Sequence, residues 1–501
     1  MNAKGKGDMQ TFWLQTKEES EAGQAAKEEG KEDAPQNDAA ALNHKLRDST
    51  MAELEETLPP KVKRLVGWNV EILKKLLQQI VAKRNACANK KINEQQLGAR
   101  EKTIGRGMYL LDEVVEIIAL PKFDSNAQKL QENPNKIELP EQVVTQLRHY
   151  VSAIAAMYRD NSFHNFEHAS HVTMSVSKLL SRIVAPDELM NSADKDLASS
   201  LHDHTYGITS DPLTQFAVVL SALIHDVDHF GVSNFQLIKE DHKLARFFKQ
   251  KSVAEQNSIV LAWEKLMSNH FTELRRFIYQ DTHELERFRQ LMVNTVLATD
   301  IFDKELSALR KNRWETAFSK SAERHANEDE HVNRKATIVI EHLIQASDVA
   351  HTMQHWHIYQ KWNERLFSEM TVAFKAGRMG SNPADGWYQG ELGFFDNYVI
   401  PLAKKLKDCG VFGVSSDEYL NYAMENRREW ATKGEEVVAK MIEKYNPKKE
   451  EEEKKDEPQA KPESAPAEAP LSKVVGDKKP EEPQNADVQT TATESSASDS
   501  S

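Results

Sequence analysis

Three short segments of the chain carry histidine and aspartate side chains of the kind that bind divalent metal ions. The first contains His164 and His168, the second contains the adjacent pair His225 and Asp226, and the third ends at Asp348. Imidazoles and carboxylates together are the ligand mixture that Zn²⁺ and other borderline divalent ions prefer. A charged Asp226 at the end of an apolar run would be costly to bury without a cation. Taken together, the three segments predict a metal site.

Helices are the elements that we expect to position these side chains. Apolar residues recur with a period of 3.6 residues in several windows, and sustained two-residue alternation is hard to find. The clearest windows are residues 65–81, 143–157 and 168–183. Residues four apart on a helix share a face, so we expect His164 to lie beside His168, and His225 beside His229. The pattern predicts an all-α catalytic domain over residues 109–446.

Composition divides the rest of the chain. Residues 15–50 and 447–501 contain no aromatic side chain and are rich in Glu, Lys and Ala, with Pro also frequent in the second. Such segments bury too little apolar surface to offset chain entropy, so we expect a disordered linker and a disordered acidic, proline-rich tail. Residues 51–108 are expected to form a helical connector that either packs on its own domain or pairs between subunits in a homodimer.

The charge and cysteine content limit the classes of function. The 501-residue chain has a formal net charge of -13, which argues against a nucleic-acid partner. It contains two cysteines, which excludes a disulfide framework and indicates a reducing compartment. The sequence shows neither an apolar run long enough to cross a bilayer nor a signal peptide. We therefore expect a cytoplasmic protein without a transmembrane segment.

Two motifs resemble the catalytic domain of class I 3′,5′-cyclic nucleotide phosphodiesterases, a branch of the HD-type metal hydrolases. They are His-Asn-x-x-His-Ala-x-x-Val at 164–172 and His-Asp-Val-Asp-His-x-Gly-x-x-Asn at 225–234. Shorter matches follow at 297–300, 393–395, 401–402 and 426–430, so the resemblance covers about residues 110–430. It implies a compact multi-helix domain that hydrolyses cAMP, cGMP or both and so terminates cyclic nucleotide signalling.

The resemblance also implies roles for individual residues. A tightly held ion, expected to be Zn²⁺, would be bound by His168, His225, Asp226 and Asp348. Asp226 would also bridge to a second ion, expected to be Mg²⁺ or Mn²⁺, and the pair would activate a bridging water as hydroxide. His164 would be the general acid that protonates the O3′ leaving group. The residues expected to hold water and ligands in place are His229, Glu255 and Thr299.

The segment expected to bind the base departs from the family. The family has a glutamine three residues before a phenylalanine that stacks on the purine, and here these positions are Glu391 and Phe394. Leu366 would close the other side of the clamp, and His351 stands where the family often has a base-contacting asparagine. An ionised Glu391 only accepts hydrogen bonds and would favour guanine, whereas a protonated one would imitate the amide. Phe230 replaces the usual proline of the second motif, which leaves the local loop geometry open.

The first fourteen residues contain a separate resemblance. Lys-Gly-Lys-Gly at 4–7, followed by Met9, Thr11 and the aromatic pair at 12–13, is similar to the end of a class III nucleotidyl cyclase. Residues 1–14 are therefore interpreted as a cyclase remnant, which implies an upstream cyclase domain in a longer fusion. Membrane association would follow only if that fusion were of the receptor type.

Three functions are compatible with these observations. The first is hydrolysis of cyclic nucleotides, which is favoured because all four metal ligands and the acid are in place. The second is a catalytically weak cyclic-nucleotide-binding or scaffold module, suggested by the unusual residues at 230, 351 and 391 and by the long tails. The third is hydrolysis of another phosphoester by an HD-type enzyme. Phe394 argues for a purine substrate and against the third.

Overall fold

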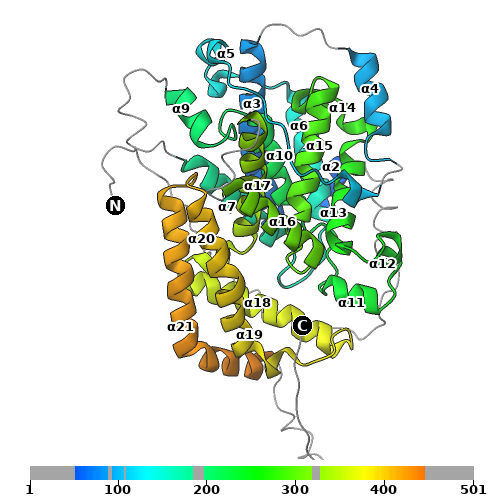
Figure 1. The fold of residues 1–501 in the computed structure, drawn as a ribbon. Helices are drawn as coiled ribbons and strands as arrows, with labels where there is room; N and C mark the ends of the chain where they lie inside the picture. The colour runs from blue at the N-terminus through cyan, green and yellow to red at the C-terminus, as the bar shows by residue number, and fades with distance from the viewer. Residues whose placement is uncertain (1–50, 88–92, 107–108, 184–196, 319–327, 446–501) are drawn as a thin grey trace, which may run out of the picture. The chain divides into compact units, whose positions relative to one another are not determined.

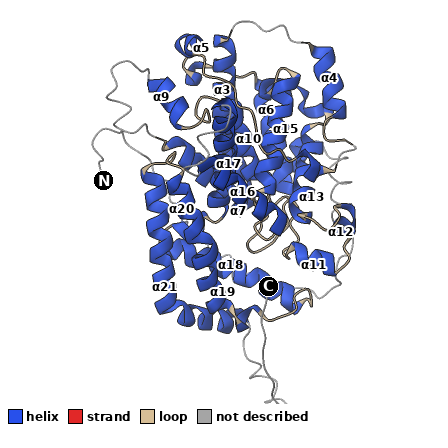
Figure 2. Cartoon of the chain, viewed as in Figure 1, coloured by secondary structure: helices blue, strands red, loops and turns tan. Residues whose placement is uncertain are grey.

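The structure is a computed structural model that describes residues 51–87, 93–106, 109–183, 197–318 and 328–445. Every regular element in these ranges is a helix and none is a strand, so the expected all-α fold is confirmed (Figure 2). None of the described helices is both long enough and apolar enough to pass through a bilayer. The segments predicted as a cyclase remnant, a disordered linker and a disordered tail (1–14, 15–50 and 447–501) lie outside the described residues.

The helices of the first part of the chain are α2 (Met51–Thr57), α3 (Pro60–Ala86), α4 (Glu94–Thr103), η2 (Leu110–Glu113), α5 (Ser125–Leu130), η3 (Pro134–Lys136), α6 (Glu141–Met157), α7 (Phe166–Ser181), α9 (Leu197–His204) and α10 (Pro212–Ile224). Those of the middle are α11 (Asn234–Lys239), α12 (Lys243–Phe247), α13 (Val253–Leu266), η4 (Asn269–Phe271), α14 (Thr272–Ile278), α15 (Thr282–Leu297), α16 (Lys304–Phe318) and α17 (Glu328–Asp348). The last are η6 (Ala350–Met353), α18 (Trp356–Lys375), η7 (Pro383–Asp385), α19 (Trp387–Phe394), η8 (Phe395–Val399), α20 (Ile400–Asp408) and α21 (Val414–Tyr445).

The helix α10 lies at the centre of the fold and packs against α3, α7 and α15 (Figure 1). Every residue of α10 except Gln215 is buried. A helix that is apolar on all sides is typical of a protein interior. Because α10 ends at Ile224, the next residue, His225, is delivered into the interior of the molecule, where it is 1% exposed.

Two further helices bring the other histidine and aspartate segments to the same place. The helix α17 packs against α7, α10 and α15, and its residues from Ala336 to Ser347 are all buried. Its last residue is Asp348, which is partly exposed. The first turn of α7 contains the buried His168. The C-terminal ends of α10 and α17 therefore meet the N-terminal end of α7.

The helix α3 was expected to belong to a connector. It contains the apolar stripe predicted over residues 65–81, and the structure packs it against α6, α7 and α10. Val66, Val70, Leu73 and Leu77 are fully buried in the same hydrophobic cluster as α10. The division at residue 109 stays a prediction, but removing α3 would expose part of this core.

The helices from α18 to α21 form the side of the fold that contains the expected base pocket. In Figure 1, α20 and α21 lie side by side, and α19 also packs against α21. The indole N–H of the buried Trp430 donates to the carbonyl oxygen of Tyr388 at 3.0 Å, which joins α21 to α19. A methyl group at Gly434 would lie 2.9 Å from the Trp430 and Tyr388 rings, so the contact requires glycine.

Candidate active site

The first motif does not form one continuous helix. Asn165 is the N-cap of α7, and its side-chain oxygen accepts the backbone N–H of His168 at 3.0 Å. His164 therefore precedes the helix, and the expectation that it shares a helical face with His168 is wrong. A capping asparagine adopts a non-helical backbone conformation and so separates the two histidines. The rings are 6.1 Å apart between centroids and lie edge to face.

The second motif also leaves the helix. After α10 ends at Ile224, the chain makes a turn in which Asp228 and Gly231 have φ of 61° and 67°. The expectation that His225 and His229 share a helical face is therefore wrong, because the turn sends them in different directions. A Cβ at Gly231 would lie 3.1 Å from the side-chain oxygen of Asn161, so both the backbone angle and the available space favour glycine.

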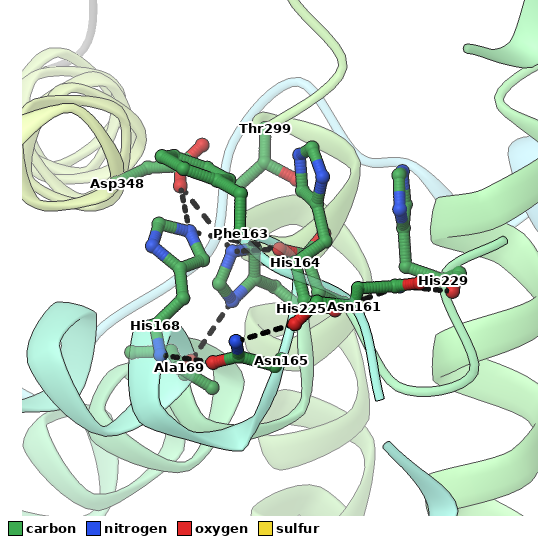
Figure 3. Close-up of polar contacts among 12 residues, drawn as sticks. Asn161, Phe163, His164, Asn165, His168, Ala169, His225, His229, Thr299 and Asp348 are labelled. Atoms are coloured by element: carbon green, nitrogen blue, oxygen red, sulfur yellow. Dashed lines mark hydrogen bonds and ion pairs between the residues drawn. The ribbon is translucent and has the colours of Figure 1, made fainter. Parts of the chain in front are cut away.

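The four predicted metal ligands converge on one point, and Figure 3 labels three of them, His168, His225 and Asp348. His225 Nε2 lies 3.0 Å from Asp226 Oδ2 and 3.3 Å from Asp348 Oδ1. His168 Nε2 lies 3.0 Å from the same Asp348 oxygen and 3.6 Å from Asp226 Oδ2. Both histidines are 1% exposed, whereas the side chains of Asp226 and Asp348 are 14% and 22% exposed. We call these four residues the metal cluster, after the role predicted for them. Its carboxylates form the part open to solvent.

The donor chemistry of the metal cluster fits a cation. His225 Nδ1 lies 2.9 Å from the carbonyl oxygen of Ala222, which can only accept, so this nitrogen carries the hydrogen. In a neutral ring Nε2 then carries a lone pair, and it is buried without a hydrogen-bond donor. It faces carboxylate oxygens that also carry lone pairs. His168 Nε2 and Asp348 Oδ1 lie within hydrogen-bond distance, at 3.0 Å. A divalent ion in place of that hydrogen would bind the imidazole lone pairs and the carboxylates together.

A proton is the alternative occupant of this position. Burial alone would lower the pKa of His225, but the carboxylates of Asp226 and Asp348 outweigh burial and hold that pKa well above its ordinary value. The neighbouring imidazoles in turn hold the pKa of Asp226 well below its ordinary value, although burial opposes this. Metal and protons therefore compete for the same lone pairs.

His164 forms a different kind of contact, with Glu369 of α18. Its Nδ1 lies 2.5 Å from Glu369 Oε1, and the backbone N–H groups of Phe163 and His164 donate to Oε2 at 2.7 and 3.0 Å. Burial alone would lower the pKa of His164, but the Glu369 carboxylate outweighs it and raises that pKa to about 9. Burial would raise the pKa of Glu369, but His164 lowers it to about 2. We call these two residues the acid pair; it holds a proton at neutral pH.

His229 lies against the acid pair. Its ring stacks on that of His164 with 3.9 Å between centroids (Figure 3). The backbone N–H of Gly231 donates to His229 Nδ1 at 3.2 Å, so in a neutral ring Nε2 carries the hydrogen. Burial, assisted by the positive charge of His164, lowers the pKa of His229 to about 4. The two stacked imidazoles therefore differ in protonation at neutral pH.

The other two residues expected to hold water and ligands make their own contacts. Glu255 Oε2 accepts the side-chain N–H of Asn234 at 2.9 Å, and the same nitrogen lies 3.3 Å from Asp300 Oδ2. Burial, together with the negative charge of Asp300, raises the pKa of Glu255 to about 8. The Thr299 hydroxyl donates to the carbonyl of Val296 at 2.7 Å. The structure thus places Glu255 in a group with Asn234 and Asp300, and His229 in a group with His164.

The residues expected to bind the base include a partly buried carboxylate. Glu391 lies in α19, and its Oε2 accepts the phenolic hydroxyl of Tyr359 at 2.7 Å. Burial raises the pKa of Glu391 to about 7, although hydrogen bonds from Tyr359 and Asn363 oppose the rise. Asn363 is itself held by Trp387, whose indole N–H donates to its side-chain oxygen at 3.1 Å. The protonation state of Glu391 therefore changes near neutral pH.

The remaining residues of the expected pocket are apolar or buried. Phe394 follows Glu391 by one helical turn and stacks on Tyr398, with 5.4 Å between ring centroids. Leu366 is partly buried and packs on the same hydrophobic core. His351 is only 6% exposed, and its ring lies 5.5 Å from that of Phe163 between centroids. The structure thus packs His351 against Phe163, whose ring also contacts that of His168 in the metal cluster.

Phe230 occupies the loop position that the sequence left open. The guanidinium of Arg159 lies 3.8 Å from the centroid of its ring. Arg159 also donates to the carboxylate of Asp228 at 2.8 Å. The phenylalanine therefore stabilises the loop by stacking on a cation that already holds the turn.

Sequence reasoning missed three residues that position the acid pair and the metal cluster. Glu369 is the partner of His164, Asn165 caps α7, and Asn161 donates to the carbonyl oxygens of His164 and His229 at 3.0 and 2.7 Å. A signal for Glu369 was present, because it follows the buried Trp362 by seven residues and so lies on the apolar stripe of α18. A charged residue on such a stripe requires a partner.

Comparison with known proteins gives a consistent result. A sequence profile of the 3′5′-cyclic nucleotide phosphodiesterase family matches residues 163–411. The chain is 25% identical over 289 residues to a probable 3′,5′-cyclic-AMP phosphodiesterase of Caenorhabditis elegans, covering 56% of this chain and 39% of that protein. It is 20% identical over 293 residues to a cGMP-specific 3′,5′-cGMP phosphodiesterase of Dictyostelium discoideum, covering 57% and 55%.

One solved structure that is similar is the phosphodiesterase domain of a rhodopsin phosphodiesterase fusion from the choanoflagellate Salpingoeca rosetta. The match has a TM-score of 0.45 and 20% identity, and it covers 60% of this chain and 85% of that domain. The chain spans less than half the length of the nematode relative and about half that of the Dictyostelium protein.

Proposed function

Because residues 163–411 belong to the 3′,5′-cyclic nucleotide phosphodiesterase family, we propose that the chain hydrolyses cAMP, cGMP or both to nucleoside 5′-monophosphates. The observation that carries the proposal is the adjacency of two groups with complementary chemistry. The metal cluster gathers two imidazoles and two carboxylates that can bind a cation, and the acid pair retains a proton. A cyclic phosphodiester needs both, because its phosphoryl group is anionic and its O3′ leaving group is a poor alkoxide.

The metal cluster would hold the tighter ion, for which Zn²⁺ suits the two imidazoles and two carboxylates. Asp226 would also bind a second ion, Mg²⁺ or Mn²⁺, on the side of the cluster that is open to solvent. This ion would keep mostly water ligands. When bound, such ions lower the pKa of a coordinated water and neutralise charge on the phosphoryl oxygens. They also make a site with several carboxylates attractive to an anion.

His164 would supply the proton for the leaving group. Its Nδ1 is engaged by Glu369, which leaves Nε2 as the nitrogen that can donate to O3′. The carboxylate of Glu369 accepts three hydrogen bonds from residues 163 and 164, so it fixes the ring and favours its charged form. Glu369 is therefore a positioning residue, and His164 is the group that touches substrate.

The base would contact the residues of α19. A carboxylate one turn before Phe394 would accept hydrogen bonds from the N1–H and N2–H groups of guanine, whereas its protonated form could pair with adenine. Tyr359 and Asn363 both hydrogen-bond the Glu391 carboxylate, so a bound base would share it with these two donors. We therefore propose that ionised Glu391 favours cGMP.

Turnover by the full chain tests the proposed function. A truncation that removes α3 is avoided because that helix forms part of the core. The chain is stripped with a chelator, and Zn²⁺ with Mg²⁺ or Mn²⁺ is then restored before cAMP and cGMP are supplied separately. We expect 5′-monophosphate from at least one nucleotide, only with metal. Nucleotide binding without product, with the metal cluster loaded, would instead favour the sensing or scaffold module.

Two predictions about assembly stay proposals. The homodimer would use a face of the region that contains α3, although the apolar stripe of this helix is engaged in its own core. The upstream cyclase domain rests on residues 1–14, which lie outside the described residues.

A further inference from the structure

A second pair of histidines lies outside the residues discussed so far. His149 is in the third turn of α6, and His270 is in the short helix η4 that precedes α14. They line a surface hollow of about 530 Å³ together with the polar side chains of Glu141, Gln142, Thr145, Gln146 and Asn269. None of these residues belongs to the metal cluster, the acid pair or the expected base pocket.

The two imidazoles point ring nitrogens at each other. His149 Nδ1 lies 3.0 Å from His270 Nε2, and the rings stack with 5.2 Å between centroids and 25° between planes. The residues are 121 positions apart in the sequence, so the fold brings them together. Without a cation, one nitrogen must donate a hydrogen and the other must accept it.

The separation of these nitrogens fits one metal ion. Metal–nitrogen bonds to imidazole are about 2.0–2.1 Å long, so nitrogens 3.0 Å apart would subtend about 91–97° at the metal. Square-planar and octahedral ions such as Cu²⁺ and Ni²⁺ prefer angles near 90°, and imidazole suits both. Zn²⁺ would accept a somewhat compressed tetrahedron. Mg²⁺ prefers oxygen ligands and would bind poorly.

The surroundings leave both imidazoles able to bind. Burial lowers the pKa of both His149 and His270. The positive charges of His270 and Arg148 lower the pKa of His149 further, against Glu55, and Lys265 lowers that of His270 further. Both rings are therefore neutral at pH 7 and carry a lone pair. His270 and Asn269 are exposed, so water can fill the remaining positions around an ion.

We propose that His149 and His270 form a binding site for a single transition-metal ion that joins α6 to η4. The preferred ions are Cu²⁺ and Ni²⁺, with Zn²⁺ weaker because of its geometry. A bound ion would replace one weak hydrogen bond with two metal bonds and so stabilise the packing of α6 on the η4–α14 segment. The site is independent of the proposed hydrolysis, since it shares no residue with it.

Metal binding by the full chain tests this site. The metal cluster is first loaded with Zn²⁺ and Mg²⁺, and Ni²⁺ is then titrated by calorimetry. We expect one further ion per chain. We expect its affinity to fall by at least about tenfold in His149→Gln and in His270→Gln, since loss of even an indirect partner of a metal costs that much. Glutamine keeps a hydrogen-bonding side chain, and circular dichroism checks that each variant folds.

The control is His283→Gln, which changes an exposed histidine of α15. It should bind Ni²⁺ as the unmodified chain does. Ni²⁺ should raise the unfolding temperature of the unmodified chain and of His283→Gln, and raise it less in His149→Gln and His270→Gln. All four proteins contain the same metal cluster, so any Ni²⁺ that binds there contributes equally and does not affect the comparison between them. Equal Ni²⁺ affinity in all four would overturn the proposal. Turnover should be unchanged in every variant, so a failure of the proposed hydrolysis would leave this result unaffected.

Discussion

The imidazoles of His225 and His164 each lie close to a carboxylate oxygen, but their remaining contacts differ. His225 Nε2 is 3.0 Å from Asp226, and its Nδ1 hydrogen is directed to the carbonyl of Ala222. His164 instead points Nδ1 at Glu369, at 2.5 Å, and nothing else competes for that hydrogen. In the first arrangement a proton and a cation compete for the same lone pairs, whereas in the second Glu369 holds the proton on His164. The backbone carbonyl that fixes the Nδ1 hydrogen of His225 is therefore the reason we propose His225 as a metal ligand and His164 as an acid.

The largest expected effect comes from removing a carboxylate of the metal cluster. Asp226→Ala takes away the oxygen that faces both His168 and His225, so the cluster should lose metal. We expect turnover to fall by more than the roughly 10²–10⁴-fold that loss of a general acid costs. Metal analysis and steady-state kinetics check this. Full metal content with normal turnover would show that the cluster is not the metal site.

Removing the side chain of His164, the proposed acid, should lower turnover without changing metal content. We expect His164→Ala to lower turnover by about 10²–10⁴-fold while keeping its metal content, because His164 contributes a proton and no metal bond. Equal loss of metal and turnover would place His164 among the metal ligands instead.

The partner of the acid gives a sharper test through pH. A general acid works only when protonated, so turnover should fall as pH rises through the pKa of His164, which Glu369 raises. In Glu369→Gln that support is lost, and the falling limb should move to lower pH. The pH profile of kcat for both proteins measures the shift. An unmoved limb would mean that Glu369 only stabilises the fold.

A smaller effect is expected at the base pocket. Its carboxylate, Glu391, accepts a hydrogen bond from the Tyr359 hydroxyl, whereas Asp226 and Glu369 lie against imidazoles. The pKa of Glu391 is about 7, so the carboxylate is protonated below that pH and ionised above it. The ratio of cGMP to cAMP turnover should therefore rise as pH increases through 7, by about tenfold if one hydrogen bond is mismatched. Glu391→Gln cannot ionise, so its ratio should not change with pH. A ratio that changes equally in both proteins would exclude Glu391 as the cause.

The smallest expected effect concerns the cap that divides His164 from His168. Asn165→Ala removes the acceptor for the His168 N–H and should lower the free energy of unfolding by about 1 kcal/mol. It should also weaken metal binding, because His168 lies in that first turn. The matched control is Asn93→Ala, which removes the cap of α4 and should cost similar stability without changing metal affinity. Denaturant unfolding and metal titration compare the two.

The sequence was informative where periodicity and residue type were enough. The apolar stripes at 65–81 and 143–157 lie in α3 and α6, and the fold brings the four residues proposed as ligands together. That they bind metal stays a prediction. Spacing failed where the chain left the helix. Asn165 and the left-handed Asp228 break the four-residue relationships that we expected around them.

The contacts that set protonation could not be predicted from the sequence. Glu369 lies 205 residues after its partner His164. Tyr359 of α18 donates a hydrogen bond to Glu391 of α19. Only packing decides whether such carboxylates meet a hydroxyl, an imidazole or a cation. The same holds for His149 and His270, which no motif connects.

The central claim is that one cation lies among His168, His225, Asp226 and Asp348, and anomalous diffraction from a crystal of the zinc-loaded chain tests it most directly. We predict an anomalous peak at the zinc edge between the two Nε2 atoms and the two carboxylate oxygens, with His164 not coordinated. A zinc peak bound elsewhere, with these four side chains joined only by hydrogen bonds, would contradict the account.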